Sequence, residues 1–411
     1  MSPHLAIGLA ILLFVAGCSS ADRPADAEEL VWAVPELDKN VAQQVVDAWH
    51  RTHPNGVKVR FERIPESADD QRRLMAVELN AGLPRFDILT LDVVWTGEFA
   101  SRGWLTDLTD IRSEITEASL PGPLQSALWN GRLWAAPFTS NVGLLYFRTD
   151  LVDTAPKTWE ELKTAVVEAR RRTGSGIAGY VAQGAQYEGL VVNFLEYVWG
   201  AGGDLASRDG GAIELTAEPA QRALDFMSEA HTDNSLFAPN FEKMTEREAL
   251  TAFANGEAVF MRNWPFAWNE TRLKLGDKVE IAPLPTFDEK SASAAVGGSN
   301  LGVSRFSRNS KAAKEFVAFA STNLKVQVDL GKLSRPPTMK AAYEDPALDE
   351  KPIKQVGQIL AKAHARPSTP QWSAISDEIQ QQVFPAYTGR IETRDAVAAI
   401  RSFLKQNVGT G

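Results

Sequence analysis

The amino-acid sequence predicts an α/β protein with mainly parallel sheets flanked by helices, followed by a helical C-terminal block. Near the N-terminus, strands at 30–34, 57–61 and 86–92 alternate with helices at 38–53 and 68–80. This order predicts βαβ units, because parallel neighbours need a long crossover connection that is usually a helix. The length of 411 residues is sufficient for two domains of ordinary size.

The first two elements after residue 29 show the patterns on which this prediction depends. Segment 30–34 is a short apolar run, which is typical of a buried strand. Segment 38–53 has apolar residues at i, i+4, i+7 and i+8, which place one stripe on one helical face. These are Val41, Val45, Ala48 and Trp49.

The third strand places an acid at a functional position. Segment 86–92 is mostly apolar and ends in Asp92. In parallel sheets ligands bind beyond the carboxyl ends of the strands, so the pattern predicts that Asp92 lies at the ligand edge.

A second α/β region follows from about residue 141. It contains predicted strands at 143–147 and 258–263 and predicted helices at 159–172 and 187–199. The last hundred residues are mainly helical, with predicted helices at 311–321, 353–363, 375–383 and 393–406.

Composition excludes several classes of protein. The chain has 43 Lys+Arg and 52 Asp+Glu, for a formal net charge of −9, and 44% of its residues are hydrophobic. These values are typical of a folded globular protein and exclude a disordered chain. Without a basic surface to release counterions from phosphates, nucleic acid is not an expected partner.

The N-terminus resembles a bacterial lipoprotein leader. Residues 5–17 are almost wholly apolar and too few to cross a bilayer as a helix. Small residues precede Cys18, the single cysteine, as in a lipobox, whose cysteine is diacylated after cleavage. We therefore expect a signal peptide at 1–17, a lipidated Cys18, and a linker at 18–29. The alternatives are an ordinary cleaved signal and a buried free cysteine.

Catalytic motifs are missing from the sequence. The motif Gly174-Ser175-Gly176-Ile177-Ala178-Gly179 matches G-x-G-x-x-G, but it follows a predicted helix, so we interpret it as a connecting turn. Only His50 and His53 are close among five histidines, too few for a metal site. We expect no catalytic residue, metal or cofactor. A secreted glycoside hydrolase remains an alternative, with Asp92, Glu98 and Glu188 as candidate acids.

The abundance of tryptophan is the remaining chemical signal. The chain has 11 Trp, most of which we expect in the core. Trp264, in the turn Asn263-Trp264-Pro265-Phe266, and Arg366, beside Pro367, are better placed for a ligand. Sugar recognition needs a flat apolar face together with convergent carboxylates, amides and guanidinium groups.

Several stretches resemble the carbohydrate-binding proteins of bacterial ABC importers, and most of all their trehalose/maltose-binding branch. The stretches are 71–74 (QRRL), 91–95 (LDVVW), 136–137 (AP), 143–146 (GLLY), 186–191 (QYEGLV), 262–268 (RNWPFAW), 297–298 (GG) and 365–367 (ARP). The resemblance implies a two-lobed periplasmic-binding-protein (flytrap) fold. Its first lobe would comprise 30–137 plus 286–332, and its second 138–285 plus 333–411.

The resemblance also implies a sugar site between the lobes. Carried over position by position, the ligand-binding residues are Asp38, Ser67, Arg72, Asp92, Thr139, Asn141, Trp264, Gly297, Gly298 and Arg366. Trp264 would stack on a sugar ring. Gly297 and Gly298 would offer backbone N–H groups without an obstructing side chain.

Three departures from the family pattern point to the ligand. Relatives that also take maltose often carry an aromatic residue at Thr139, an acid at Asn141 and Trp at Ser299. The resemblance therefore favours trehalose or a related α-glucose disaccharide. An oligosaccharide, a polyol or another glycoside remains an alternative.

The expected partners follow from the same resemblance. They are a disaccharide, the membrane permease subunits of an ABC importer, and the lipid bilayer through acylated Cys18. We expect a monomer, held in the periplasm or at the cell surface by its lipid.

Overall fold

The computed structural model describes residues 29–174, 176–207, 213–233, 236–348 and 352–408. The predicted signal peptide, Cys18 and all but the last linker residue lie outside the described residues. In the described part of the chain, no helix combines the length and apolar character that a bilayer crossing demands.

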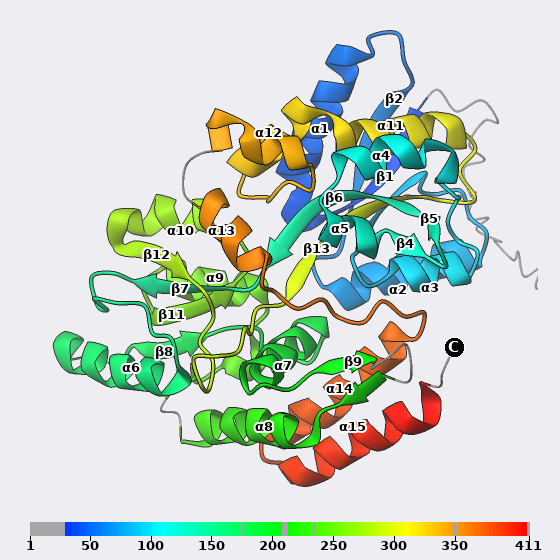
Figure 1. Ribbon diagram of the computed structural model, residues 1–411. Helices are drawn as coiled ribbons and strands as arrows, with labels where there is room; N and C mark the ends of the chain where they lie inside the picture. The colour runs from blue at the N-terminus through cyan, green and yellow to red at the C-terminus, as the bar shows by residue number, and fades with distance from the viewer. Residues whose placement is uncertain (1–28, 175, 208–212, 234–235, 349–351, 409–411) are drawn as a thin grey trace, which may run out of the picture.

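Five strands form the first sheet, in the order β2-β1-β3-β13-β6. Strands β1 (Glu29–Pro35), β2 (Lys58–Ile64) and β3 (Ile88–Asp92) are parallel. Strand β13 (Val296–Val303) runs antiparallel to β3 and to β6 (Ala135–Val142). Figure 1 shows this sheet in the upper half of the molecule.

The second sheet has the order β12-β7-β11-β8 and lies below the first in Figure 1. Its strands are β7 (Leu144–Arg148), β8 (Ala178–Val181), β11 (Ala258–Asn263) and β12 (Val279–Ala282). Strand β11 is parallel to β8 and antiparallel to β7, which also pairs with β12 in the antiparallel sense.

Two short antiparallel pairs complete the strands. They are β4 (Leu128–Trp129) with β5 (Arg132–Leu133) and β9 (Leu205–Ser207) with β10 (Ile213–Leu215).

The predicted α/β class is confirmed, but the sheets are mixed rather than mainly parallel. Only Gly143 separates β6 from β7, so the chain leaves one sheet and enters the other there. Strand β13 returns to the first sheet from the second. It begins beside the carboxyl end of β3, where Ser299 pairs with Asp92, and must therefore run opposite to it.

The predicted helices agree closely with the structure, and 68–80 agrees at both ends. The helices are α1 (Lys39–Thr52), α2 (Ala68–Asn80), α3 (Thr96–Ser101), α4 (Arg112–Ala118), α5 (Pro121–Ser126), α6 (Trp159–Thr173), α7 (Glu188–Gly200), α8 (Ala217–Thr232), α9 (Glu246–Ala254), α10 (Ala267–Leu275), α11 (Ser310–Thr322), α12 (Leu324–Lys332), α13 (Ile353–Leu360), α14 (Trp372–Tyr387) and α15 (Thr393–Asn407).

The glycine-rich motif is a helix-to-strand connection, as predicted. Gly174 ends α6 in the left-handed conformation, with φ of 62°, and β8 follows at Ala178. Glycine is favoured at such a helix end because it has no Cβ to oppose positive φ.

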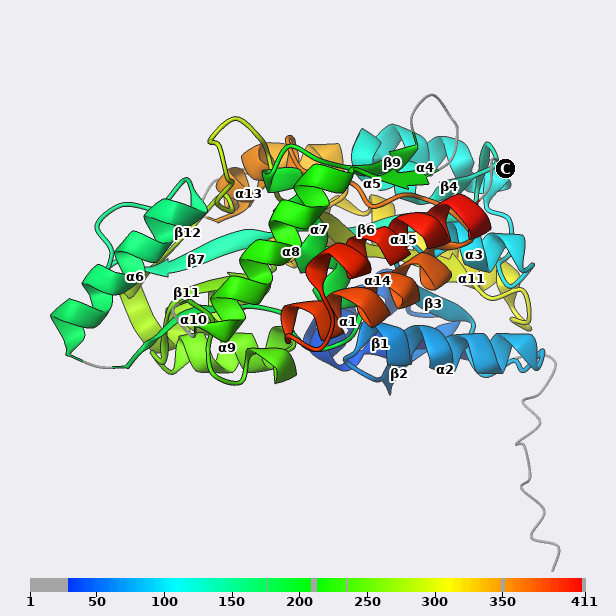
Figure 2. The ribbon, with the colours of Figure 1, turned by 90° about the horizontal axis from the view of Figure 1, so that it is seen from below.

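The predicted C-terminal helical block divides between the lobes: α11 packs on β6 and β13 of the first lobe, and the last two helices pack on the second. Helices α14 and α15 contact each other and α8, and α14 also contacts α7. Figure 2 shows α8, α14 and α15 lying together on one side of the molecule.

The lobe boundaries stay a prediction, which the packing modifies at one point. After α12, the short 3-10 helices at Lys340–Glu344 and Pro346–Leu348 still contact that helix. Val328, Ala342 and Leu348 form a small apolar cluster with Ile353. This cluster favours extending the second segment of the first lobe from residue 332 to Leu348.

Candidate functional site

A cleft of about 910 Å³, counting its open mouth, lies between the two lobes. One side is formed by the ends of β1 and β3 with parts of β6 and β13; the other includes the starts of α7 and α9. Eight of the ten predicted residues line it: Asp38, Asp92, Thr139, Asn141, Trp264, Gly297, Gly298 and Arg366.

Arg366 connects the two lobes inside the cleft. Its Nη2 donates to Oδ1 of Asp92, at the end of β3, over 3.0 Å. Its Nη1 donates to Oε1 of Glu188, the first residue of α7, over 2.5 Å. Burial opposes the charge on Arg366, but Asp92 and Glu188 outweigh burial and raise the pKa of the guanidinium.

Glu188 is held by further donors from α14. Trp372 Nε1 donates to its Oε1 over 3.1 Å, and Ser376 Oγ donates to its Oε2 over 2.5 Å. Burial raises the pKa of Glu188 to about 7; the nearby carboxylate of Asp92 acts in the same direction, while Arg366 opposes the shift. The start of α7 therefore supplies a buried acid that titrates near neutrality.

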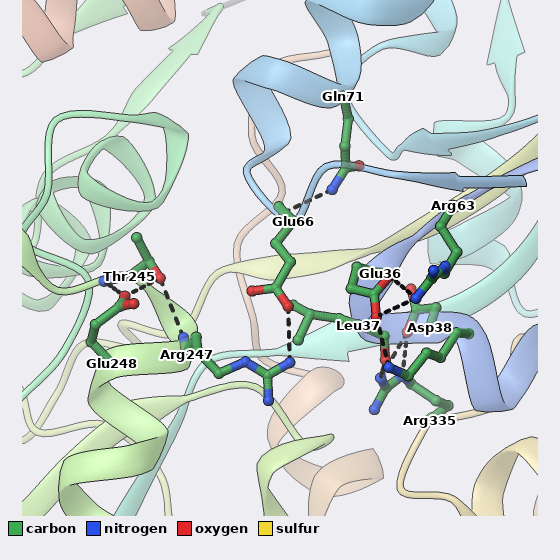
Figure 3. A network of polar contacts seen from close by, with 11 residues as sticks. Glu36, Leu37, Asp38, Arg63, Glu66, Gln71, Thr245, Arg247, Glu248 and Arg335 are labelled. Atoms are coloured by element: carbon green, nitrogen blue, oxygen red, sulfur yellow. Dashed lines mark hydrogen bonds and ion pairs between the residues drawn. The ribbon is translucent and has the colours of Figure 1, made fainter.

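A second guanidinium–carboxylate pair lies elsewhere in the cleft. Arg335 donates from Nε and Nη2 to Oδ1 of Asp38, over 2.9 and 2.7 Å. The Arg335 guanidinium also lies 4.9 Å from the ring centroid of Phe266, which belongs to the other lobe. Figure 3 shows Arg335 beside Asp38 and Leu37.

Trp264 is half-buried, and its ring is held from two directions. Its Nε1 donates to Oε1 of Glu246 over 3.3 Å, while Oε2 of Glu246 accepts from the Tyr187 hydroxyl over 2.6 Å. The Arg262 guanidinium lies 3.9 Å from the indole centroid and is paired with Glu196 at 2.7 Å. These contacts fix the orientation of the ring before a ligand arrives.

Gly297 and Gly298 line the cleft, but packing is what requires glycine at both positions. A Cβ at Gly297 would come within 2.9 Å of the Trp264 ring. Gly298 has φ of 122°, and a Cβ there would collide with the carbonyl oxygen of Thr139 on β6. Glycine at these two positions therefore leaves space for the ring of Trp264 and for strand β6, while contact of their N–H groups with a ligand stays a prediction.

Two buried polar atoms in the cleft have no hydrogen-bond partner within the described residues. They are Oδ1 of Asn141 and Nε of Arg366. Buried polar groups are almost always paired, so these two atoms are exceptions among the side chains that line the cleft. Thr139 is already engaged, since its Oγ1 lies 2.9 Å from Oγ of Ser299.

Arg72 does not line this cleft, contrary to its expected role. Its Nε and Nη2 donate to the two carboxylate oxygens of Glu98 over 2.8 and 2.6 Å. The buried Glu98 also accepts from Ser373 Oγ on α14, over 2.6 Å. Arg72 on α2 therefore binds α3 of the same lobe outside the cleft, and Glu98 makes the contact with α14 of the other lobe.

Ser67 is also absent from the cleft lining. It is the N-cap residue of α2, and its neighbours Glu66 and Ala68 do line the cleft. Because the chain turns into the helix at Ser67, adjacent residues point to different sides.

Several residues that line the cleft were not predicted from the sequence. They are Glu66, Gln71, Tyr187, Glu246, Phe266 and Arg335. Glu188 was predicted only as a candidate catalytic acid. One signal could have found Glu246. Thr245 and Glu248 form a capping box, which marks a helix start at that position. Arg335 has no local signal, since its partner Asp38 is 297 residues away.

Metal binding has no visible basis in the described part of the chain, which holds no group of three or more His, Cys, Asp or Glu side chains suited to an ion.

The family model for bacterial extracellular solute-binding proteins matches residues 35–323. This chain belongs to that family. A probable ABC transporter-binding protein of Deinococcus radiodurans is 28% identical over 89% of this chain and 90% of its own length. A maltooligosaccharide ABC transporter solute-binding lipoprotein of Streptococcus pneumoniae is 24% identical over 98% and 96%.

Solved structures agree with this assignment. The maltose-bound T. maritima MalE3 superimposes with a TM-score of 0.85 and 33% identity, covering 92% of this chain and 99% of that chain. The predicted family and two-lobed α/β fold are confirmed. Membership of a solute-binding family also confirms that the protein is not an enzyme, so the glycoside hydrolase alternative is set aside.

Proposed function

We propose that this solute-binding protein is the sugar receptor of an ABC importer, and that it captures trehalose or a related α-glucose disaccharide such as maltose. The observation that carries the proposal is the Asp92–Arg366–Glu188 bridge between the lobes, with the partly exposed Trp264 in the same cleft. Carboxylates, guanidinium groups and one flat ring are the groups that a hydroxyl-rich pyranose requires.

The chemistry is sufficient for useful affinity. Hydrogen bonds to charged groups contribute roughly 1.5–3 kcal/mol each in a dry site. Three or four of them with one stacked ring reach about −8 kcal/mol, which is micromolar, after the cost of ordering. Closure then follows from population shift, because only the closed form brings both lobes onto the sugar.

The relatives support a sugar ligand. The T. maritima protein was solved with maltose, and the S. pneumoniae relative is described as a maltooligosaccharide-binding lipoprotein. Both point to α-linked glucose units.

The preference for trehalose rests on small polar residues at the cleft. By the family resemblance, Thr139, Asn141 and Ser299 occupy positions where relatives that take maltose as well as trehalose often have rings or acids, and all three line the cleft. A long maltodextrin needs an extended aromatic platform, whereas this cleft has Trp264 with Tyr187 and Phe266. These few aromatic side chains favour a ligand of two sugar rings over a longer one.

Titration calorimetry against trehalose, maltose, sucrose and maltotriose tests the ligand. We expect micromolar or tighter binding of trehalose, with maltose next. An absence of heat with every sugar would reject the disaccharide, and stronger binding of a polyol or another glycoside would redirect the proposal to that ligand.

We also propose that Cys18 carries lipid and tethers a monomeric receptor to the membrane beside its permease. The lipobox-like residues before Cys18 support this anchor. Cells fed a radioactive fatty acid should label the wild-type protein but not Cys18→Ser. Equal label, or none in either protein, would contradict the anchor.

A further inference from the structure

Glu66 and Arg247 form an ion pair that spans the mouth of the cleft. Glu66 belongs to the connection between β2 and α2 in the first lobe, and its side chain lines the cleft. Arg247 is in the first turn of α9 in the second lobe, and its Nη2 lies 3.0 Å from Oε1 of Glu66. Figure 3 shows the two side chains facing each other.

The strand order places this pair at one end of the cleft. Strand β2, which leads to Glu66, is one edge of the first sheet, and β6, which continues into the second lobe, is the other edge. The ends of β1 and β3, with Asp38 and Asp92, lie between them. The Glu66–Arg247 pair is therefore at the outer end, farthest along the sheet from the crossing strand β6.

Both partners are held in place by their own segments. The backbone carbonyl of Glu66 accepts from Nε2 of Gln71 over 2.8 Å. The capping box of Thr245 and Glu248 fixes the first turn of α9. Glu246, next to Arg247, binds the indole of Trp264 inside the cleft, so one helix turn connects the stacking ring to the pair.

The side chains are about 41% and 37% exposed for Arg247 and Glu66, so the pair is at the rim and can open. An exposed pair of this kind is weak by itself. It blocks the outer end by occupying it: an additional ring there would have to separate the two charges and displace both side chains.

We propose that the Glu66–Arg247 pair is a gate that selects ligands of two sugar rings over longer ones. This specificity role rests on the proposed disaccharide function. A two-ring ligand lies behind the closed gate, whereas a third ring at the outer end keeps the gate open and prevents full closure of the lobes.

The test compares each disaccharide with its homologue extended by one glucose. The probes are trehalose with glucosyl-trehalose, and maltose with maltotriose, measured by calorimetry. For the wild-type protein we expect the extended sugar to bind at least about tenfold more weakly. For Arg247→Ala we expect the ratio of the two dissociation constants, extended sugar to disaccharide, to fall below about threefold, whatever the change in disaccharide affinity.

Two further variants make the test specific. Arg73→Ala removes an exposed partner of Asp70 on the same helix α2, outside the cleft, and should leave the ratio unchanged. The exchange Glu66→Arg with Arg247→Glu rebuilds the pair in reverse and should restore the tenfold discrimination.

The possible outcomes separate the gate from the sugar function. Equal wild-type affinity for disaccharide and extended sugar, or an unchanged ratio in Arg247→Ala, would overturn the gate while leaving the sugar function intact. Binding of no sugar by the folded wild-type protein would overturn the proposed function and the gate together.

Discussion

The orientation of a single indole decides much of the recognition at this site. Trp264 is positioned by Glu246 at its Nε1 and by Arg262 at its ring, and Gly297 leaves space for its edge. Since none of these contacts needs a ligand, the ring is preorganised, and little ordering cost remains for stacking.

Trp264→Ala should therefore weaken binding of the preferred disaccharide by about 2 kcal/mol, roughly thirtyfold, because a preformed apolar face is lost. Titration calorimetry measures the effect. Trp129→Ala, which truncates a partly buried ring outside the cleft, should leave the affinity unchanged. An equal dissociation constant for Trp264→Ala and the wild type would remove the ring from the site.

The buried acid Glu188 makes stability depend on pH. Its pKa is raised from 4.5 to about 7 in the folded protein, chiefly by burial and then by Asp92, so the folded state binds more protons than the unfolded state between these values. Its contribution to stability is thus fully present below pH 4.5 and is lost as pH rises through 7.

Relative to Glu188→Gln, the unliganded wild-type protein should lose up to about 3 kcal/mol of unfolding free energy between pH 4.5 and 7.5. Urea unfolding of both proteins across that range gives the difference, in which other titrating groups cancel. A difference that rises with pH would show that Arg366 governs this carboxyl more strongly than burial does.

At the scale of elements, the strands that cross between the lobes are the least predictable part of the fold. Strand β6 (AAPFTSNV) contains a proline, and β13 (VGGSNLGV) contains three glycines. Proline and glycine are both poor strand formers. The two segments become strands because each pairs with the other, and β13 also pairs with β3. By contrast, the helix at 68–80 and the strand at 258–263 were predicted to the residue.

Gly298→Ala tests whether the pairing of β13 with β6 needs glycine at this position. Alanine at this position would be strained by the positive φ, and its Cβ would collide with the Thr139 carbonyl oxygen. We therefore expect the unfolding free energy, measured with urea, to fall by about 3 kcal/mol or more. Gly122→Ala, in helix α5 with open space around it, should be neutral or slightly stabilising. Similar effects for both substitutions would contradict the packing argument.

At the scale of the whole molecule, the lobes meet through polar contacts at several points. Arg366 binds both lobes inside the cleft, Glu98 accepts from Ser373 behind it, and Glu66 meets Arg247 at its mouth. Polar contacts separate at lower cost than an apolar interface, because water replaces each hydrogen bond. The contacts between lobes therefore suit a hinge that opens and closes.

We expect the radius of gyration, measured by small-angle X-ray scattering, to decrease when the preferred disaccharide is added. Arg366→Gln should remain in the larger state under the same conditions, since it loses the guanidinium fork between Asp92 and Glu188. Arg73→Ala is the matched control and should compact like the wild type. An unchanged radius for the wild type would show that binding does not require lobe closure.

Local patterns in the sequence were sufficient to predict the fold class, the family resemblance and eight of the residues that line the cleft. Hydrophobic periodicity is local, so it identified helices and strands, while strand ends and a ring beside proline indicated Asp92 and Trp264. The direction of each long side chain, by contrast, depends on contacts that form only in the folded protein. Arg72 turns to Glu98 on α3, and Arg335 reaches Asp38 from 297 residues away, because such partners come together only when distant segments of the chain pack against each other.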